Sequence, residues 1–229
     1  MQGLGVVGRN HSRTAWYDTE SLAERDGWLY VGIERVNRIV RFDFARCGFR
    51  ARASDVKDIA SGIAYLPGNK GLEALVAPAA GRFSGTLIAF SERGLDAAGN
   101  LKAFLIGPPP AQGRRNNAEF TVRRRDDFDI SDAAMLPSGD VLLLERRFSW
   151  FSGLAMRLRH VAIGSIAPGA LVDGTDLLFA DSATQIDNME GLSVHTDAAG
   201  AVVLTLISDD NFNHFLQRTV LLQFRLVDR

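Results

Sequence analysis

Residues 187–194, Asp-Asn-Met-Glu-Gly-Leu-Ser-Val, place a carboxylate directly before a short apolar run. A turn follows at Ala199-Gly200, and a second apolar run then leads to the acids of residues 206–210, Leu-Ile-Ser-Asp-Asp. Short apolar runs bounded by Gly, Asn and Asp are typical of β-strands. The stretch therefore predicts two strands joined by a turn, with an acid before the first strand and another at the end of the second.

This two-strand pattern occurs four times along the chain. The acid before the first strand recurs at intervals of 53, 59 and 58 residues, as Glu20, Glu73, Asp132 and Glu190. The acid at the end of the second strand recurs at intervals of 58, 53 and 64 residues, as Glu34, Glu92, Glu145 and Asp209. Agreement of two elements in phase over four units indicates an internal repeat. A repeat of roughly 40–60 residues that holds about four strands matches a β-propeller blade.

Helical periodicity is nearly absent, so we predict an all-β chain that forms one β-propeller domain over residues 1–229. Four blade units are visible, and a parent protein would have five or six. Ring closure would use residues 3–7 or the last strand. The expected strands are Trp28–Ile33, Arg38–Phe44, Phe49–Ala53, Leu72–Ala77, Thr86–Ser91, Leu101–Ile106, Glu119–Arg123, Ala133–Leu136, Val141–Glu145, Ala155–Ile163, Leu177–Phe179, Gly191–His195, Val202–Ile207 and Val220–Leu226.

Composition and charge exclude several classes of protein. The net charge is −1 and the pI is near 6.4, without the basic excess of a nucleic-acid-binding protein. No apolar run approaches the ~20 residues of a membrane-spanning helix, so we expect no membrane partner. The single cysteine, Cys47, excludes a disulfide framework and a cysteine-rich metal site.

Equivalent positions of propeller blades are related by rotation, so the repeated acids are expected to form a ring at the mouth of the central channel. Carboxylates held close together repel one another unless cations offset their charge. We therefore predict a Ca²⁺ site, because Ca²⁺ takes six to eight oxygen ligands. The alternative is that each acid pairs with an arginine such as Arg35, Arg93 or Arg146. The expected metal ligands are Glu20, Glu73, Glu190 and Asp209, and the expected ligand-binding residues around them are Asn69, Asn188, Asp210 and Asn211.

The catalytic candidates are two Glu-Arg pairs, Glu34-Arg35 and Glu145-Arg146. Arginine presents a planar fork that binds phosphate or carboxylate, and a metal ion could activate the attacking water. The alternative is that an arginine after a strand-end glutamate faces solvent or caps the next blade. The sequence contains no Gly-x-Ser-x-Gly nucleophile elbow, phosphate-binding loop or His-Glu-x-x-His motif.

Several of these segments, taken together and in order, resemble the bacterial phytase-like family, described as "esterase-like activity of phytase". The segments are residues 18–23, 32–35, 69–75, 187–193, 208–211 and 217–222. The resemblance runs from about Asp18 to the C-terminus. It implies a β-propeller, an exported (periplasmic or secreted) bacterial protein, and a phosphoester or ester hydrolase that can depend on calcium.

Members of this family usually carry a further blade before the segment that matches Asp18. We therefore expect this chain to be truncated at its N-terminus, and an exposed strand edge could then pair with another copy of the chain.

The leading hypothesis is a metal-assisted hydrolase of a small anionic ester, in which Arg35 and Arg146 bind the substrate. The alternative is a non-catalytic propeller scaffold that recognises a cationic or metal-bridged ligand, because the fold alone does not choose between them. In either case the last blade, with the additional oxygens of Asp187, Asn188, Asp210 and Asn211, is expected to contribute most ligands.

Overall fold

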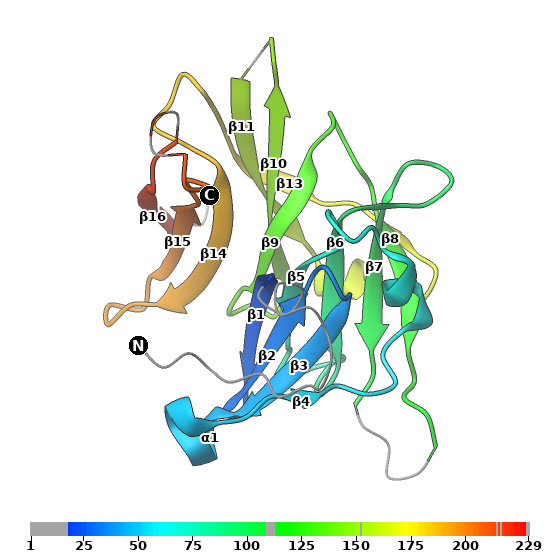
Figure 1. Ribbon diagram of the computed structural model, residues 1–229. Helices are drawn as coiled ribbons and strands as arrows, with labels where there is room; N and C mark the ends of the chain where they lie inside the picture. Colours follow the sequence, from blue (N-terminus) through cyan, green and yellow to red (C-terminus); the bar gives the residue numbers. More distant parts are fainter. Residues whose placement is uncertain (1–17, 109–112, 152, 214, 216, 228–229) are drawn as a thin grey trace. The chain divides into compact units, whose positions relative to one another are not determined.

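The computed structural model describes residues 18–108, 113–151, 153–213, 215 and 217–227 (Figure 1). These residues form four sheets, in which the strands that follow one another along the chain pair antiparallel, with little helix. Contacts divide the chain into two compact units, which are described separately below. Within the described ranges, no helix has the length and hydropathy needed to cross a membrane.

The first unit comprises residues up to Val122 together with Ala167–Leu171. Its two sheets are built from strands that follow one another along the chain, in the orders β1-β2-β3-β4 and β5-β6-β7-β8, with β12 added beside β8. The first sheet contains β1 (Thr19–Arg25), β2 (Trp28–Ile33), β3 (Arg38–Asp43) and β4 (Ser54–Asp55). The second sheet contains β5 (Leu72–Val76), β6 (Leu87–Leu95), β7 (Leu101–Ile106), β8 (Ala118–Val122) and β12 (Leu171–Val172).

The second unit comprises Arg123–Ile166 and Val172–Arg229. Its strand orders are β9-β10-β11-β13 and β14-β15-β16. The third sheet contains β9 (Asp129–Met135), β10 (Val141–Ser149), β11 (Gly153–Val161) and β13 (Thr175–Asp181). The fourth sheet contains β14 (Met189–Thr196), β15 (Val202–Ser208) and β16 (Leu221–Leu226). Each of the four sheets is thus an up-and-down meander, as expected for a propeller blade.

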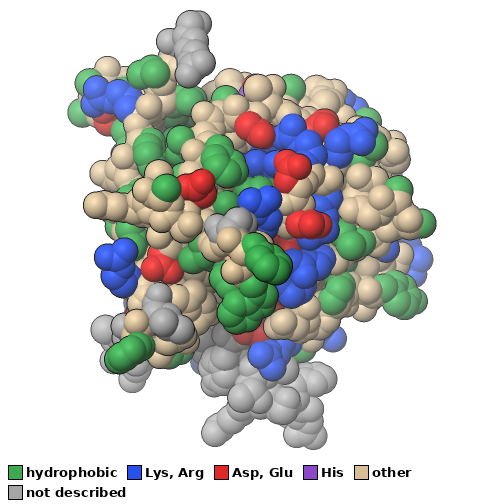
Figure 2. Space-filling model, turned by 90° about the horizontal axis from the view of Figure 1, so that it is seen from above, with side chains coloured by type: hydrophobic (Ala, Val, Ile, Leu, Met, Phe, Trp, Pro, Cys, Tyr) green, Lys and Arg blue, Asp and Glu red, His purple; other side chains and the backbone are tan. Residues whose placement is uncertain are grey.

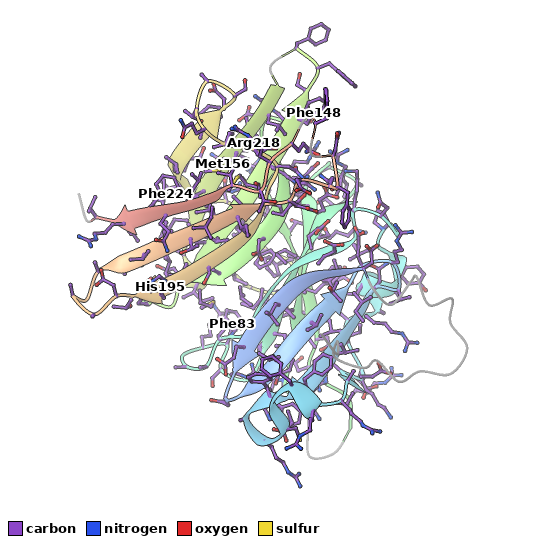
Figure 3. All side chains as sticks on the ribbon, turned by 60° about the vertical axis from the view of Figure 1, so that its left-hand side comes forward. Phe83, Phe148, Met156, His195, Arg218 and Phe224 are labelled. Atoms are coloured by element: carbon purple, nitrogen blue, oxygen red, sulfur yellow. The ribbon has the colours of Figure 1, made fainter. Side chains whose placement is uncertain are left out.

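Each unit has its own apolar core, made where two sheets meet. In the first unit, Ile39 and Tyr30 of the first sheet share a buried cluster with Leu75 and Phe104 of the second. In the second unit, a cluster of buried residues from the third and fourth sheets includes Met156, and Phe224 packs against it (Figure 3). Alternating apolar residues therefore hold the sheets of each unit together in pairs.

Charged side chains of both signs lie on the face that Figure 2 presents. On the face that Figure 2 presents, acidic side chains lie interspersed with basic ones rather than in a region of one sign. This distribution is in keeping with the net charge of −1.

A β-bulge occurs at the same place in the first strand of every sheet. The ladder skips one residue between Thr19 and Ser21, between Leu72 and Ala74, between Ile130 and Asp132, and between Met189 and Gly191. The bulged residues are Glu20, Glu73, Ser131 and Glu190. A bulge re-aims a side chain and is often found beside functional sites. The repeat of the sequence is therefore a repeat of the backbone.

The third repeat unit corrects the sequence alignment by one residue. Ser131, not Asp132, is the bulged residue there, because Ile130 pairs with Glu145 and Asp132 pairs with Leu144. The residue just before each bulge pairs with a residue of the second strand of the sheet. The next residue along that second strand is Glu34, Glu92, Arg146 or Asp209 in the four sheets. Because a shift of one residue turns a side chain to the other face, Glu145 does not belong with these acids.

The positions of most expected strands are confirmed, with ends that differ by a few residues. The strand predicted at Phe49–Ala53 is wrong. That region contains the short helix α1 (Phe44–Cys47) and a 3-10 turn at Gly48–Arg50. Asp43 accepts a hydrogen bond from the N–H of Arg46 and caps the helix, and Gly48 has a φ of +54° that ends it. The two-residue strands β4 and β12 were not predicted, and β1 was expected only through the repeat pattern that places a short strand after Glu20. The possible closing segment at residues 3–7 lies outside the described residues.

Candidate functional site

Three buried carboxylates come together in the first unit. Oxygen atoms of Glu34, Glu73 and Glu92 all lie within 4.8 Å of one another. A second group, which shares Glu34, adds Asp18 and the exposed Glu20 under the same criterion. Like charges at this separation raise the energy of the folded chain unless cations offset them. The first unit therefore contains a concentration of negative charge that favours a cation.

The repeated strand pattern positions these acids. Glu73 is the bulged residue of β5, and Glu34 directly follows β2. The backbone N–H of Glu34 donates to the carbonyl of Asp18, and the N–H of Glu92 donates to the carbonyl of Gly71. Each second strand is therefore tied to the start of the first strand of its own sheet, and this holds the carboxylates at one end of their sheets.

Glu34 also connects the two sheets of the first unit. Its carboxylate accepts hydrogen bonds from the backbone N–H of Lys70 and, at 2.7 Å, from that of Gly71. Gly71 has to be glycine, because a Cβ atom would lie 2.5 Å from the carbonyl oxygen of Pro67. Lys70 has a φ of +88°, which is rare for a residue with a side chain. Its Nζ lies 3.3 Å from Glu92 and supplies one positive charge to the group.

Arg35 lies at the more accessible side of the acids. Its Nε contacts Asp18 Oδ2 at 2.6 Å, and its side chain is 57% exposed. The hydrogen bond from Arg35 to Asp18, followed by the charge of Asp18, raises the pKa of the guanidinium above its ordinary value. Arg35 is thus a permanent cation held beside the carboxylates, with room to meet an anion from solution.

The donor set fits a hard divalent cation. Ca²⁺–oxygen distances are about 2.3–2.6 Å, so two oxygens bound to one ion lie at most about 5 Å apart. The 4.8 Å limit on Glu34, Glu73 and Glu92 meets this condition. All the donors are oxygens, which suit Ca²⁺, Mg²⁺ or Mn²⁺ better than softer ions.

In the second unit, the guanidinium of Arg146 lies beside the bulged acid Glu190. Nη1 of Arg146 lies 2.9 Å from Oε1 of Glu190, and Arg146 also donates to Oδ1 of Asn188. Nδ2 of Asn188 donates to Glu190 at 2.7 Å. Arg146 occupies the position in the third sheet that Glu34, Glu92 and Asp209 occupy in the other three sheets. Glu190, the bulged acid of the fourth sheet, therefore meets an arginine. This is the arrangement that the alternative interpretation of the sequence expected.

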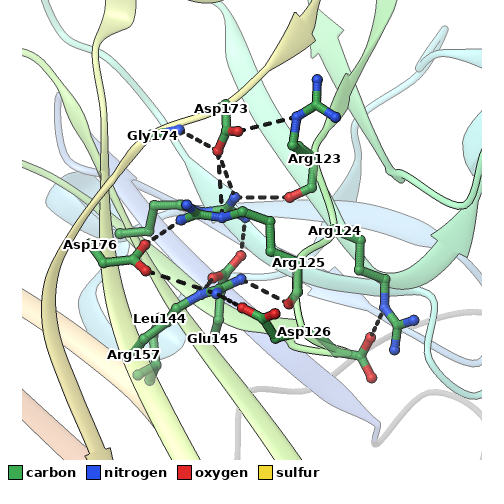
Figure 4. A network of polar contacts seen from close by, with 12 residues as sticks. Arg123, Arg124, Arg125, Asp126, Leu144, Glu145, Arg157, Asp173, Gly174 and Asp176 are labelled. Carbon is green, nitrogen blue, oxygen red and sulfur yellow. Dashed lines mark hydrogen bonds and ion pairs between the residues drawn. The ribbon is translucent and has the colours of Figure 1, made fainter.

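Glu145, predicted as catalytic, is fully buried in the interior of the second unit. Its carboxylate pairs with Arg157 (Figure 4). It also pairs with Arg159, and both arginines are buried. Arg159 reaches Asp173 at 3.2 Å, and Arg157 donates to the backbone carbonyl of Arg125 at 3.2 Å. Burial lowers the pKa of Arg159, and the charge of Glu145 opposes that effect. The position of Glu145 indicates a structural role.

The acids at the end of β15, in the fourth repeat, accept hydrogen bonds from their own loop. Asp209 is exposed and accepts from the N–H of Asn211, while Asp210 accepts from the N–H of Phe212 and from Thr219 Oγ1. Nδ2 of Asn211 donates to Gln217. The expectation that the last unit supplies most ligands stays a prediction. The metal-compatible carboxylate groups in the described part of the chain belong to the first two sheets. Asn69 is exposed beside Lys70.

The sequence analysis missed two polar features of the second unit. Arg157 lies directly opposite Glu145, and Arg159 follows two residues later along β11, so the spacing i, i+2 would have placed both arginines on one face of the strand. Asp132 accepts hydrogen bonds from the N–H of Leu192 at 2.7 Å and of Ala133 at 2.8 Å. Burial raises the pKa of Asp132 to about 7. The sequence carries no signal of that burial.

The solved structures include two similar chains from Bacteroides thetaiotaomicron. The crystal structure of an endo-arabinase from strain VPI-5482 has a TM-score of 0.52 and 12% identity, over 90% of this chain and 74% of that one. The extracellular domain of a one-component system has a TM-score of 0.24 and 13% identity, over 93% and 36% of the two chains. The second likeness is too weak for any argument. The first confirms the predicted fold class, an all-β propeller.

No curated protein matches the sequence. A family model described as "Phytase-like: Esterase-like activity of phytase" matches residues 6–212. The match includes the two-strand pattern of all four repeats and both carboxylate groups of the first unit, and it ends before β16. The chain belongs to this phytase-like family.

Proposed function

We propose that the chain is a metal-assisted hydrolase of small anionic esters, phosphoesters in particular. The observation that carries this proposal is the convergence of the buried carboxylates Glu34, Glu73 and Glu92 within 4.8 Å. Membership of a family described by esterase-like activity supports the reaction class. The likeness to the endo-arabinase concerns the fold alone.

The three carboxylates would hold the metal, and Ca²⁺ is the ion that we propose, because the donors are all oxygens. A bound divalent cation supplies Lewis acidity, which polarises a phosphoryl or carbonyl oxygen and makes water more acidic. Lys70 and the N–H of Gly71 orient the carboxylates of Glu92 and Glu34. Arg35 would bind the anionic group of the substrate, because a guanidinium makes charge-assisted hydrogen bonds with phosphate.

Calcium is expected to stabilise the protein through Glu73. At a free concentration one hundred times the Kd, a ligand adds about 2.7 kcal/mol to the free energy of unfolding. This corresponds to a rise in Tm of roughly 5–10 °C for a chain of this size. Calorimetry with added Ca²⁺ and then with EDTA measures the shift, and Glu73→Gln should abolish it.

The matched control is Glu190→Gln, which removes the bulged acid that already pairs with Arg146. This variant should keep the full calcium response. A wild-type Tm that neither Ca²⁺ nor EDTA moves would rule out the metal site, and equal responses of the two variants would rule out the assigned ligands.

Hydrolysis is tested with a panel of phosphate and carboxylate esters. We expect Glu73→Gln to lower kcat by at least about 100-fold, the loss typical when one electrostatic group of a catalytic site is removed. Arg35→Gln should mainly raise KM, because Arg35 binds the anion in ground state and transition state alike. Glu190→Gln should leave both constants unchanged. Turnover that continues in EDTA and in Glu73→Gln would contradict the proposal.

The burial of the site supports a second candidate, a non-catalytic binding scaffold. Glu34, Glu73 and Glu92 are each no more than 6% exposed, which limits access for a substrate. A metal held there would stabilise the first unit or bridge to an anionic ligand. This candidate predicts the same calcium-dependent rise in Tm without turnover of any ester, so the two experiments together separate the alternatives.

A further inference from the structure

The hairpin of β10 and β11 extends beyond the rest of the third sheet (Figure 1). β9 pairs with β10 only as far as Arg146, and β13 pairs with β11 only as far as Ala155. Beyond these points the two strands pair with each other alone, down to Ser149 opposite Gly153. A two-stranded ribbon without further packing is only marginally stable in water.

The end of this ribbon carries three exposed aromatic side chains. Phe148 is 59% exposed, Trp150 is 90% exposed and Phe151 is fully exposed. Phe148 lies on the projecting part of the hairpin (Figure 3), and its ring meets that of Trp150 edge to face with centroids 5.3 Å apart. A large aromatic side chain buries roughly 150–250 Å² when it is covered. An exposed apolar patch of this kind marks an interaction site.

The shape and the size of this aromatic tip restrict its partner. Pockets for small molecules are concave, whereas the tip is the free end of a projecting ribbon. A stable dimer buries about 800 Å² on each partner, more than three aromatic side chains supply. A fluid apolar phase can surround the tip, so it requires neither a concave pocket nor a large contact area.

The residues of the tip fit the boundary between lipid and water. Trp is enriched at that boundary because its ring is apolar and its N–H is polar. Residues 147–154, Arg-Phe-Ser-Trp-Phe-Ser-Gly-Leu, contain no acid, and their single charge is Arg147. The guanidinium of Arg147 is held at the base of the tip, over the ring of Phe128 and against the backbone carbonyl of Asp126. Nothing in the tip therefore repels the phosphates of lipid headgroups.

We propose that the aromatic tip, formed by Phe148, Trp150 and Phe151, inserts into the interface of a lipid bilayer and attaches the protein to a membrane surface. The expectation that the chain has no membrane partner rested on the lack of a long apolar run, which concerns spanning and not surface attachment. Insertion requires no change in the body of the third sheet, because Phe148, Trp150 and Phe151 lie beyond the strands that support it.

The test mixes the full chain with vesicles of phosphatidylcholine alone or with phosphatidylglycerol added. We expect the protein to sediment with both kinds, with a roughly fivefold preference for the anionic vesicles from the one arginine. Trp150 emission should move to shorter wavelength on binding. Trp150→Phe should lose that shift and still sediment, because Phe inserts as well.

The double variant Phe148→Ser with Phe151→Ser should lower the partition coefficient by at least about tenfold, since burial of each ring contributes that much or more. Its Tm should match the wild type, because the tip is outside the core. The matched control is Phe49→Ser with Tyr65→Ser, two other highly exposed aromatics, which should bind vesicles normally.

Three results would overturn the proposal. The first is wild-type protein that sediments with neither kind of vesicle. The second is unchanged sedimentation of the double variant. The third is self-association, seen by sedimentation velocity, that the double variant abolishes while vesicles bind nothing, which would assign the tip to a second copy of the chain.

Discussion

Replacement of Glu145 by glutamine is expected to lower the free energy of unfolding by about 3–5 kcal/mol, the cost of breaking a buried ion pair by removing one partner. Glu145, Arg157 and Arg159 are at most 2% exposed. Without the carboxylate, two guanidinium groups would remain in the interior and keep only the outer acids, such as Asp173 at 3.2 Å from Arg159. The Tm should fall by roughly 6–20 °C.

Urea denaturation at neutral pH measures this loss. Glu190→Gln is the matched control, because it breaks the ion pair with Arg146. Both side chains of this pair are about one-quarter exposed, so the variant should lower the free energy of unfolding by no more than about 1 kcal/mol. A triple variant, Glu145→Leu with Arg157→Met and Arg159→Met, should recover most of the stability, since apolar residues can replace a buried ionic group at little cost. Equal losses in Glu145→Gln and Glu190→Gln would contradict the structural role of Glu145.

Asp132 should make the protein less stable as the pH rises from about 4 to about 7. Its pKa is raised from 3.8 to about 7 in the folded chain, mainly by burial. Over that interval the folded state keeps a proton that the unfolded state has lost, so the free energy of unfolding falls with pH and levels off above about 7. A shift of three units corresponds to about 4 kcal/mol, and we expect about half of that because the side chain is only partly buried.

Urea denaturation between about pH 2 and pH 8 tests this in wild type and Asp132→Asn. The variant should lose the decrease and keep a constant cost from one lost hydrogen bond to Leu192 or Ala133. Asp140→Asn is a control of opposite sign, because the N–H of Ile163 and the ring of His160 lower the pKa of Asp140. The stabilisation from Asp140 is present above pH 3.8 and is lost as the pH falls below that value. Parallel pH profiles for wild type and Asp132→Asn would contradict the assignment.

The repeat pattern predicted the fold class because propeller blades are local structures. Apart from the two-residue strand β12, each sheet uses strands that come in order along the chain, so apolar runs and turn residues specify most of its pairing. The same pattern located Glu20, Glu73 and Glu190 at equivalent positions, and all three are bulged residues. The family resemblance rested on the same segments, and the family model matches residues 6–212.

The candidate site was predicted less well, because it depends on the direction of single side chains. In the third sheet the bulged residue is Ser131. Because of this one-residue shift, Arg146 lies beside Glu190 and Glu145 lies in the interior. Bulge registers follow from the packing of neighbouring strands, which a periodic pattern does not record.

The sequence by itself determined the all-β repeat, the four units and the acids that recur in phase, because these follow from local hydrophobic alternation and turn chemistry. Only the tertiary structure decided which acids share a site and which pair with arginine. Glu34, Glu73 and Glu92 lie within 4.8 Å of one another although 58 residues separate the first from the last. The charge on a carboxylate is set by its neighbours in space, and those neighbours come from strands that only folding brings together.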